Sequence, residues 1–165
     1  MTNGAAAFCQ AQHQRLVGLL SLQVGDRHVA EELAQDVLIK VCEHWPSLEN
    51  PTAWMHRVAI NHANSWFRRR GAERRANARH HNQQVGQGSP DRADAVAVRE
   101  AVARLPRRQR TAVAYRYYAG FSVRETADAM SCAEGTVKAL THQAIASLRD
   151  SGALMPTTDE EDLHV

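Results

Sequence analysis

Apolar residues recur at every third or fourth position along most of this 165-residue chain, which is the period of an α-helix that buries one side. In the stretch from position 26 to 45, Val29, Leu33, Val37 and Val41 stand four apart with charged residues between them. No stretch alternates apolar and polar residues at every second position, as a half-buried strand would. The sequence therefore predicts an all-α protein.

One segment interrupts this pattern. Between His80 and Asp94 the chain is polar, contains glycine, serine and proline, and has no apolar period, which is typical of a linker. The chain is long enough for two small domains. We therefore expect an N-terminal helical bundle over residues 1–78, a flexible linker over 79–95 and a C-terminal helix-turn-helix domain over 96–150. Residues 151–165, which carry the acidic run Asp159 to Asp162, are expected to be a disordered tail.

Residues with strong capping preferences predict where the N-terminal helices begin and end. Asp26 can cap the helix that carries the valine stripe. Asn50 followed by Pro51 combines a favoured N-cap with a favoured first helical position. We expect this helix to run to about Arg70 and to stop at Gly71.

The last third of the chain has the layout of a helix-turn-helix. Pro106 is expected to begin one helix and Gly120 to end it. Ser122 and Ser131 are each followed three residues later by glutamate, the capping-box pattern, which predicts helices at about 123–130 and 133–149. The apolar positions of the last helix recur at helical spacing: Val137, Leu140, Ala144 and Leu148.

The second helix of such a motif places its N-terminal side chains against base edges in the major groove. The spacing leaves five positions of this helix to face DNA: Thr136, Lys138, Ala139, His142 and Gln143. Glutamine can pair with adenine, threonine can contact a thymine methyl group, and lysine can reach phosphate or guanine. A helical hairpin inside a bundle would show the same spacing and stays an alternative.

The net charge of +2 conceals strong local bias. Two stretches are rich in arginine: 66–79, with Glu73 as its one acid, and 101–124, with no acid. The helix that begins near Asp26 has an acidic outer face instead, through Glu31, Glu32 and Asp36. Basic zones suit phosphate backbones, whereas an acidic face suits a basic protein surface. A single charged run is often only a solvated surface.

The expected helix 51–70 also carries a polar stripe. Arg57, Asn61, Asn64 and Arg68 stand at spacings of 4, 3 and 4, so they share one side. Such a stripe can bind phosphates with its arginines and bases with its amides. Asn61 could instead satisfy a buried helix end. Trp54 and Trp66 are expected in the core. 

Several other classes of protein are disfavoured. Three isolated cysteines are not the framework of a secreted domain, and no apolar run is long enough to span a membrane. We expect a cytoplasmic protein without a membrane contact. Cys9 and His13 stand four apart but lack further ligands at zinc-like spacing. We expect no metal, no cofactor and no enzymatic activity, since no catalytic constellation is recognisable.

Three blocks resemble the extracytoplasmic-function (ECF) sigma factors of bacterial RNA polymerase, and together they span most of the chain. The blocks are residues 25–38, residues 51–61 and the three segments 105–110, 116–122 and 132–138. They resemble, in order, the family's polymerase-clamp helix, its promoter-melting helix and its second DNA-binding domain. The short length and the residues Lys138 to Thr141 resemble an actinobacterial SigE-like branch.

The resemblance implies a sigma factor that binds RNA polymerase core and directs promoter recognition, promoter melting and initiation. The acidic helix would dock on the β′ clamp through Glu32, Gln35 and Asp36. The minus-ten element would be read and opened by Asn50, Arg57, Asn61, Asn64, Arg68 and Arg69. The minus-thirty-five element would be contacted by Arg107, Arg124, Thr136, Lys138, Ala139, His142 and Gln143, with the last helix against the β flap. An anti-sigma factor is a possible further partner, and no residue would be a catalyst.

The chain departs from the family at two places. Many relatives carry Ser-Arg where this chain has Ala139-Leu140, so its recognition helix is less basic, and Cys42 stands where an aromatic residue is common. Two other hypotheses remain open. A helix-turn-helix regulator that acts without polymerase would fit the last third of the chain, and a bare interaction protein, such as an inactive paralogue, would fit all of it.

Overall fold

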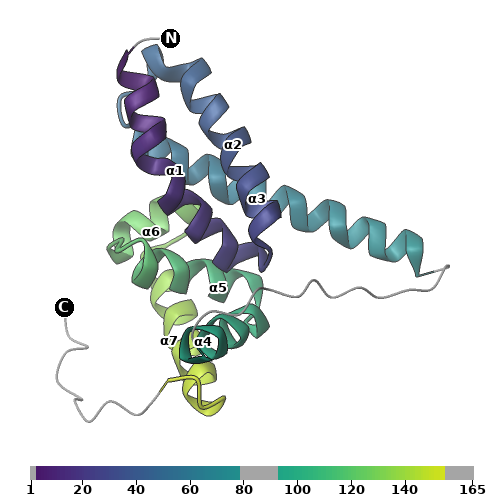
Figure 1. Cartoon of the computed structure of the whole chain (residues 1–165). Coiled ribbons are helices and arrows are strands. Elements are labelled where there is room, and N and C mark those ends of the chain that lie inside the picture. The colour runs from purple at the N-terminus through teal and green to yellow at the C-terminus, as the bar shows by residue number, and fades with distance from the viewer. Residues whose placement is uncertain (1–2, 79–92, 155–165) are drawn as a thin grey trace.

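The computed structural model describes residues 3–78 and 93–154, and in these residues it contains helices and no strand. The N-terminal half comprises α1 (Asn3–Val24), α2 (Arg27–His44), the short 3₁₀ helix η1 (Trp45–Ser47) and α3 (Pro51–Asn77). The C-terminal half comprises α4 (Ala93–Arg104), α5 (Arg107–Val113), the π-helical turn η2 (Ala114–Tyr118), α6 (Val123–Met130) and α7 (Glu134–Asp150) (Figure 1). The all-α prediction is confirmed. Most of the predicted linker, and the tail beyond Leu154, lie outside the described residues.

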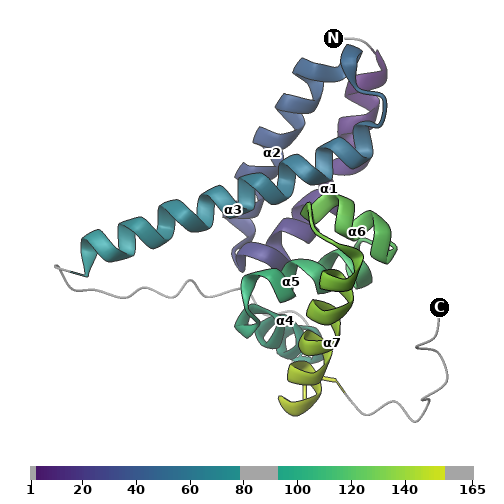
Figure 2. The same cartoon turned by 180° about the vertical axis from the view of Figure 1, so that it is seen from behind.

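The N-terminal half is a three-helix bundle. Helices α1 and α2 lie side by side, α3 crosses them, and the end of α3 projects away from the rest of the protein (Figures 1 and 2). The core buries three positions of the α2 stripe with apolar residues of α1 and α3: Leu33, Val37 and Val41 of α2, Leu16, Val17 and Leu20 of α1, and Met55, Ala59 and Ala63 of α3. Trp54 and Trp66 pack against the core, as expected from the sequence.

The N-terminal caps form as predicted. The Asp26 carboxylate accepts hydrogen bonds from the backbone N–H groups of His28 (2.8 Å) and Val29 (3.2 Å), and the Asn50 side chain accepts one from Ala53 N–H at 3.0 Å. The predicted end at Gly71 is wrong, because α3 continues to Asn77. A glycine ends a helix by adopting positive φ, and Gly71 is not among the residues that do so. The residues after it are mainly Ala, Glu and Arg, which are strong helix formers.

The C-terminal half contains the predicted helix-turn-helix in α6 and α7. Its first capping box is confirmed: Ser122 Oγ accepts from Glu125 N–H at 3.1 Å, and Glu125 Oε2 accepts from Ser122 N–H at 2.8 Å. These two hydrogen bonds hold the pKa of the Glu125 carboxyl below its usual value. Gly120 has φ of 72° before this helix, as a chain reversal there requires.

The second predicted capping box is wrong. Ser131 has φ of 52° and forms the left-handed C-cap of α6, where its backbone N–H reaches the carbonyl groups of Ala127 and Asp128. Helix α7 begins at Glu134 with Ala133 as its N-cap and no side-chain cap. The end of α6 therefore determines the conformation of Ser131, which leaves only a short turn between the two helices.

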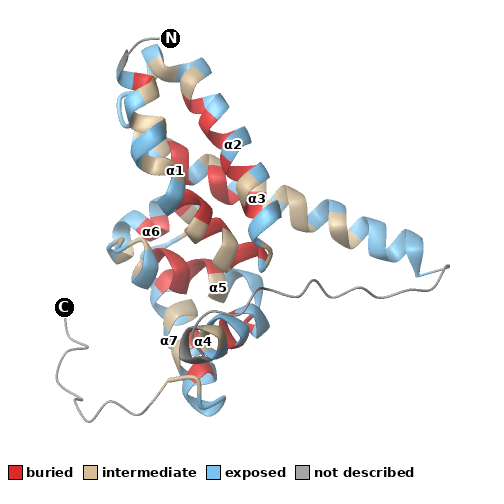
Figure 3. Ribbon diagram, in the orientation of Figure 1, coloured by how far each residue is buried: buried red, intermediate tan, exposed pale blue. Residues whose placement is uncertain are grey.

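Two apolar clusters complete the structure. One lies inside the C-terminal half and joins α4, α5 and α7 through Ala101, Val102, Leu105, Val113, Ala144 and Leu148. The other joins the two halves: Leu19 of α1 and Ile60 of α3 pack with Ala114, Tyr115 and Ala129. Figure 3 shows buried positions that continue from the N-terminal bundle into α5 and α6. The two halves are therefore packed together in this structure.

Candidate nucleic-acid interface

The polar stripe of α3 lies on its solvent-exposed side. Arg57, Asn61, Asn64, Arg68 and Arg69 are all exposed, because the opposite side of the helix carries the buried residues of the bundle core. Asn61 therefore does not satisfy a buried helix end. Arg68 donates to Ser65 Oγ at 2.8 Å, one turn earlier on the same helix. The stripe presents arginine groups that can contact phosphates and amide groups that can contact bases.

Asn50 is exposed but is already used locally. Its side-chain oxygen accepts the hydrogen bond that caps α3, which leaves its amide N–H₂ group as the donor that could meet a ligand. 

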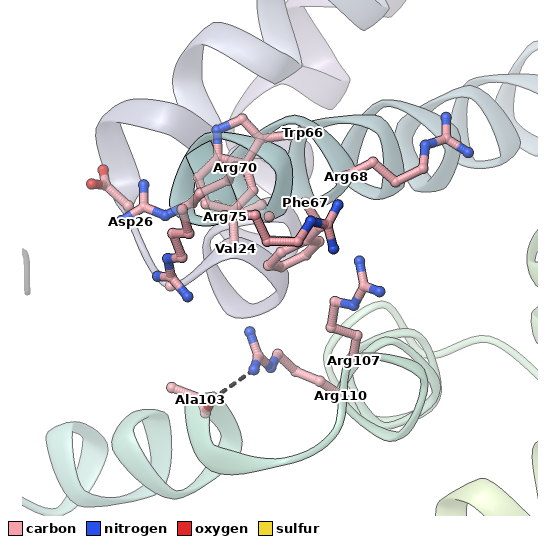
Figure 4. Close-up of a pocket in the computed structure, with 13 residues that line it drawn as sticks. Val24, Asp26, Trp66, Phe67, Arg68, Arg70, Arg75, Ala103, Arg107 and Arg110 are labelled. Atoms are coloured by element: carbon pink, nitrogen blue, oxygen red, sulfur yellow. Dashed lines mark hydrogen bonds between the residues drawn. The ribbon is translucent and has the colours of Figure 1, made fainter. Parts of the chain in front are cut away.

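The charged end of α3 and the start of α5 line a cavity of about 830 Å³ (Figure 4). We call it the arginine cavity. Its lining includes Arg68, Arg70, Arg74 and Arg75 of α3 with Arg107 and Arg110 of α5, and Asp26 is the one acid among the described residues that line it. The guanidinium carbon of Arg107 lies 5.1 Å from the centre of the Phe67 ring, and that of Arg70 lies 5.1 Å from the centre of the Trp66 ring. The cavity therefore has a positive field suited to polyanions.

Arg110 contributes to this cavity but its guanidinium is engaged. It donates to the carbonyl oxygens of Gln23 (2.7 Å), Ala103 (2.6 Å) and Leu105 (3.0 Å). Burial and the nearby Arg107 lower its pKa. Arg110 belongs to the arginine-rich stretch 101–124. In the structure its hydrogen bonds connect α5 to the ends of α1 and α4 and to the turn between α4 and α5.

Four of the five α7 positions that the sequence assigns to the DNA-facing side are exposed. Lys138, Ala139, His142 and Gln143 of α7 are exposed, as is Arg124 of α6, whereas Thr136 is half-buried. Val137, Ala144 and Leu148 are buried on the opposite side, and Leu140 is half-buried. Gln143 Oε1 accepts a hydrogen bond from Gln109 Nε2 of α5 at 3.2 Å. The beginning of α7 is thus open to a groove.

The acidic face lies elsewhere, on the outer side of α2. Glu32, Gln35 and Asp36 are exposed there. Glu32 lies 3.5 Å from His28 Nε2, an ion pair when that imidazole is protonated. None of these three side chains lines the arginine cavity.

The joint between the two halves was not foreseen from the sequence. The His56 ring packs edge-on against Tyr115 and Phe121, with ring centres 5.4 and 4.7 Å away, and Tyr115 Oη donates to the His56 carbonyl oxygen at 3.3 Å. Burial, and secondarily Arg15, lowers the pKa of His56 to about 4. Burial raises the pKa of Tyr115. The one available signal was the concentration of aromatic residues between 115 and 121 in a chain with few aromatics.

This joint brings candidate residues for two DNA elements together. Asn64 of α3 lines a cavity of about 230 Å³ with Arg107 and Arg108 of α5. Gly18 of α1 lies so close to Tyr118 that a Cβ atom there would meet its hydroxyl at 1.9 Å. 

The described residues contain no group of three histidine, cysteine or carboxylate side chains that could hold a metal ion. Among the described helices, none is both long and apolar enough to cross a membrane.

The comparisons with known proteins follow the same division of the chain. Residues 9–73 match the family model "Sigma-70 region 2", and residues 95–148 match "Sigma-70, region 4". The RNA polymerase sigma-E factor of Streptomyces antibioticus is 30% identical over 124 residues, which cover 73% of this chain and 69% of that protein. The ECF RNA polymerase sigma factor SigL of Mycobacterium tuberculosis is 31% identical over 137 residues, which cover 76% and 75%.

This chain belongs to the ECF sigma factors. 

A solved structure extends the similarity to the arrangement of the helices. The sigma factor RpoE of Bartonella quintana, solved in complex with the anti-sigma factor NepR, matches with a TM-score of 0.71 and 27% identity, over 90% of this chain and 98% of that one. The sigma factor CnrH, in complex with the cytosolic domain of CnrY, shares the fold with a TM-score of 0.65 at 17% identity.

The function follows from the family. The protein is a sigma factor that directs RNA polymerase to promoters, and sigma factors are initiation factors rather than enzymes. A helix-turn-helix regulator independent of polymerase is not favoured, because region 2 is matched as well as region 4. 

Proposed function

We propose that the two halves of this ECF sigma factor bind different partners. Residues 1–78 would bind the polymerase core and the minus-ten element, and residues 96–150 would bind the minus-thirty-five element, with 79–95 as the linker and 151–165 as an acidic tail. The observation that carries the proposal is the separation of charge in the described residues. An exposed acidic face lies on α2, while exposed arginine and amide groups lie on α3, α5 and the helix-turn-helix.

The polymerase would dock on α2. Glu32, Gln35 and Asp36 point to solvent from a helix whose other side is fully used by the bundle core. Carboxylates repel DNA and attract a basic protein surface, which fits the coiled coil of the β′ clamp. The last helix, α7, would lie against the β flap of the polymerase.

The minus-ten element would be read by α3 and the loop before it. Arg57, Arg68 and Arg69 would neutralise phosphates, and the amides of Asn50, Asn61 and Asn64 would meet bases. Melting requires capture of an unpaired base, which costs a few kcal/mol of lost stacking and pairing that pocket contacts must offset. 

The minus-thirty-five element would be read by the helix-turn-helix. Lys138, His142 and Gln143 would face the groove, and Arg107 and Arg124 would contact phosphates, with Thr136 and Ala139 against the groove wall. With Ala139-Leu140 in place of the more basic pair found in many relatives, we expect weaker phosphate contacts at this helix.

The two halves would have to separate on the promoter. Two elements about 25 base pairs apart lie about 85 Å apart on straight duplex, at 3.4 Å per pair. Asn64 and Arg107, assigned to different elements, line one small cavity in the structure. We infer that the packed arrangement belongs to the free factor and that the polymerase holds it open.

Two finer assignments are also part of the proposal. The short chain and Lys138 to Thr141 support a place in the actinobacterial SigE-like branch, and the sigma-E factors of Streptomyces are among its relatives. The solved relatives that share its helix arrangement are complexes with anti-sigma proteins, which supports an anti-sigma partner for this factor.

Run-off transcription tests the proposal. The purified protein is mixed with core polymerase and a library of upstream DNA, and the transcribed templates are sequenced. We expect transcripts from templates that share two short motifs. The double variant Glu32→Lys/Asp36→Lys should lose binding to core in a pull-down, whereas Glu100→Lys, an exposed acid on α4, should keep it. Transcription by the Glu32→Lys/Asp36→Lys variant at the wild-type level would refute the docking assignment.

A further inference from the structure

Two cysteines face each other across the contact between α1 and α2. The Sγ atoms of Cys9 and Cys42 lie 3.3 Å apart, although the residues are 33 positions apart in the sequence. Cys9 Sγ can also donate to the Leu38 carbonyl oxygen, 3.7 Å away. Both thiols are free and half-buried, so a small molecule can reach them. A disulfide bond is about 2.05 Å long, so the sulfurs need to approach by only about 1.2 Å.

The pair does not fit a metal centre. A structural zinc site needs four ligands, and the part of the chain that the structure describes offers no cluster of three suitable side chains. The third cysteine, Cys132, lies in the turn between α6 and α7, in the other half of the protein. What remains at Cys9 and Cys42 is an isolated dithiol.

We propose that Cys9 and Cys42 are a redox modification site, at which hydrogen peroxide or a related peroxide converts the two thiols into a reversible disulfide between α1 and α2.

The reaction balances with one peroxide molecule. The Cys42 thiolate attacks one peroxide oxygen, so that an S–O bond forms, the O–O bond breaks, and the released hydroxide is protonated to water. Cys9 Sγ then attacks the sulfur of the resulting sulfenic acid, the S–S bond forms, and the S–O bond breaks. The leaving hydroxide takes the Cys9 proton and departs as the second water. Both sulfurs are oxidised and the peroxide is reduced.

The order of the two steps follows from the environment of Cys9. Burial, together with the Cys42 side chain, raises the pKa of Cys9 to about 11. Because the thiolate is the attacking species in the first step, Cys9 is the poorer choice there. The second attack is intramolecular, between sulfurs that lie 3.3 Å apart in the reduced protein, so it can proceed with the smaller thiolate fraction of Cys9.

The bond would strengthen the region that docks on polymerase. It closes a loop that contains the α1–α2 turn, which restricts the unfolded chain. The exposed side chains of Glu32, Gln35 and Asp36 are not involved, so, on the proposed docking role of α2, the oxidised factor should still bind core. The modification would then preserve the factor under oxidative conditions rather than inactivate it.

The full chain is treated with hydrogen peroxide, quenched and digested without reductant. We expect a Cys9–Cys42 cross-linked peptide, a mass lower by two hydrogens, and full reversal by dithiothreitol. Cys132→Ser, the matched control, should behave like the wild type, whereas Cys9→Ser and Cys42→Ser should form no internal bond. If circular dichroism shows that these two variants fold poorly, the cross-linked peptide is compared between the oxidised and the reduced wild-type protein instead.

Thermal unfolding supplies the second measurement. Closure of a loop of this length should raise the Tm of the oxidised protein by about 10 °C over the reduced protein. Intact thiols at Cys9 and Cys42 after peroxide, over-oxidation without a bond, or preferential bonding to Cys132 would each overturn the proposal. So would an unchanged or lower Tm. A stabilised disulfide form that no longer binds core would refute the docking role of α2 and leave the modification site intact.

Discussion

The pH dependence of the joint between the two halves is the most quantitative consequence of the structure. His56 is 7% exposed, and its Nδ1 atom finds no hydrogen-bond partner among the described residues. Burial, and then the charge of Arg15, lowers its pKa from 6.5 to about 4. Tyr115 and Phe121, which cover the ring, both come from the C-terminal half. If the halves separate, water reaches His56 and its pKa returns toward 6.5.

The sign and size of the effect follow from proton linkage. The packed form has the lower pKa, so between pH 6.5 and 4 the separated form binds more protons and acid favours separation. Above about pH 7.5 His56 is almost entirely neutral in both forms and the equilibrium changes little. At pH 5 the ratio of separated to packed protein should rise roughly 30-fold over its value at pH 7.5, which is about 2 kcal/mol.

Small-angle X-ray scattering of the free factor measures this equilibrium. We expect the radius of gyration to rise between pH 7.5 and 5 while circular dichroism reports intact helices. His56→Phe keeps an aromatic ring against Tyr115 and Phe121 but cannot titrate, so its radius should stay constant over this range. The control His142→Asn changes an exposed histidine on α7 and should respond like the wild type. An equal response from the His56→Phe variant would refute the reasoning.

Other substitutions test the caps, the joint and the basic surface. Ser122→Ala should lower the free energy of unfolding by about 1 kcal/mol in denaturant titration because it removes an N-cap. Ser131→Gly should be neutral or slightly stabilising, since Ser131 has φ of 52° and glycine adopts positive φ without strain. Tyr115→Phe should cost about 1 kcal/mol by removing the hydrogen bond to the other half, and a loss below about 0.3 kcal/mol would contradict the role of that bond. Lys138→Ala should weaken promoter binding by the holoenzyme and reduce the dependence of log K on log salt by about one unit in fluorescence anisotropy, whereas an unchanged salt slope would place Lys138 away from phosphate.

Features that depend on near neighbours in the sequence were predictable. The period of the valine stripe determined the buried side of α2, and Asn50-Pro51 marked the start of α3. Even so, equal local patterns gave different results. Ser122 and Ser131 both head an S-x-x-E sequence, but the end of α6 requires a left-handed residue at Ser131. 

Features that depend on distant parts of the chain were not predictable. Nothing in the pattern around His56 indicates that Tyr115 and Phe121 will cover it, because the three residues meet only when the halves pack. The same holds for the contact between Cys9 and Cys42. Most of the candidate site residues named from the sequence are exposed, yet nothing in the basic stretch 101–124 indicates that Arg110 binds backbone carbonyls.

The hydrogen bonds of Arg110 have a consequence for evolution and engineering. All three acceptors are main-chain carbonyls, which every amino acid supplies. Mutations at Gln23, Ala103 or Leu105 can therefore accumulate without removing the acceptors, provided that the helices keep their positions. Of the three acceptors only the Gln23 carbonyl lies in the N-terminal half, so a hybrid of two such factors would form this hydrogen bond if it retains Arg110 and the apolar packing of Leu19 and Ile60 against Tyr115.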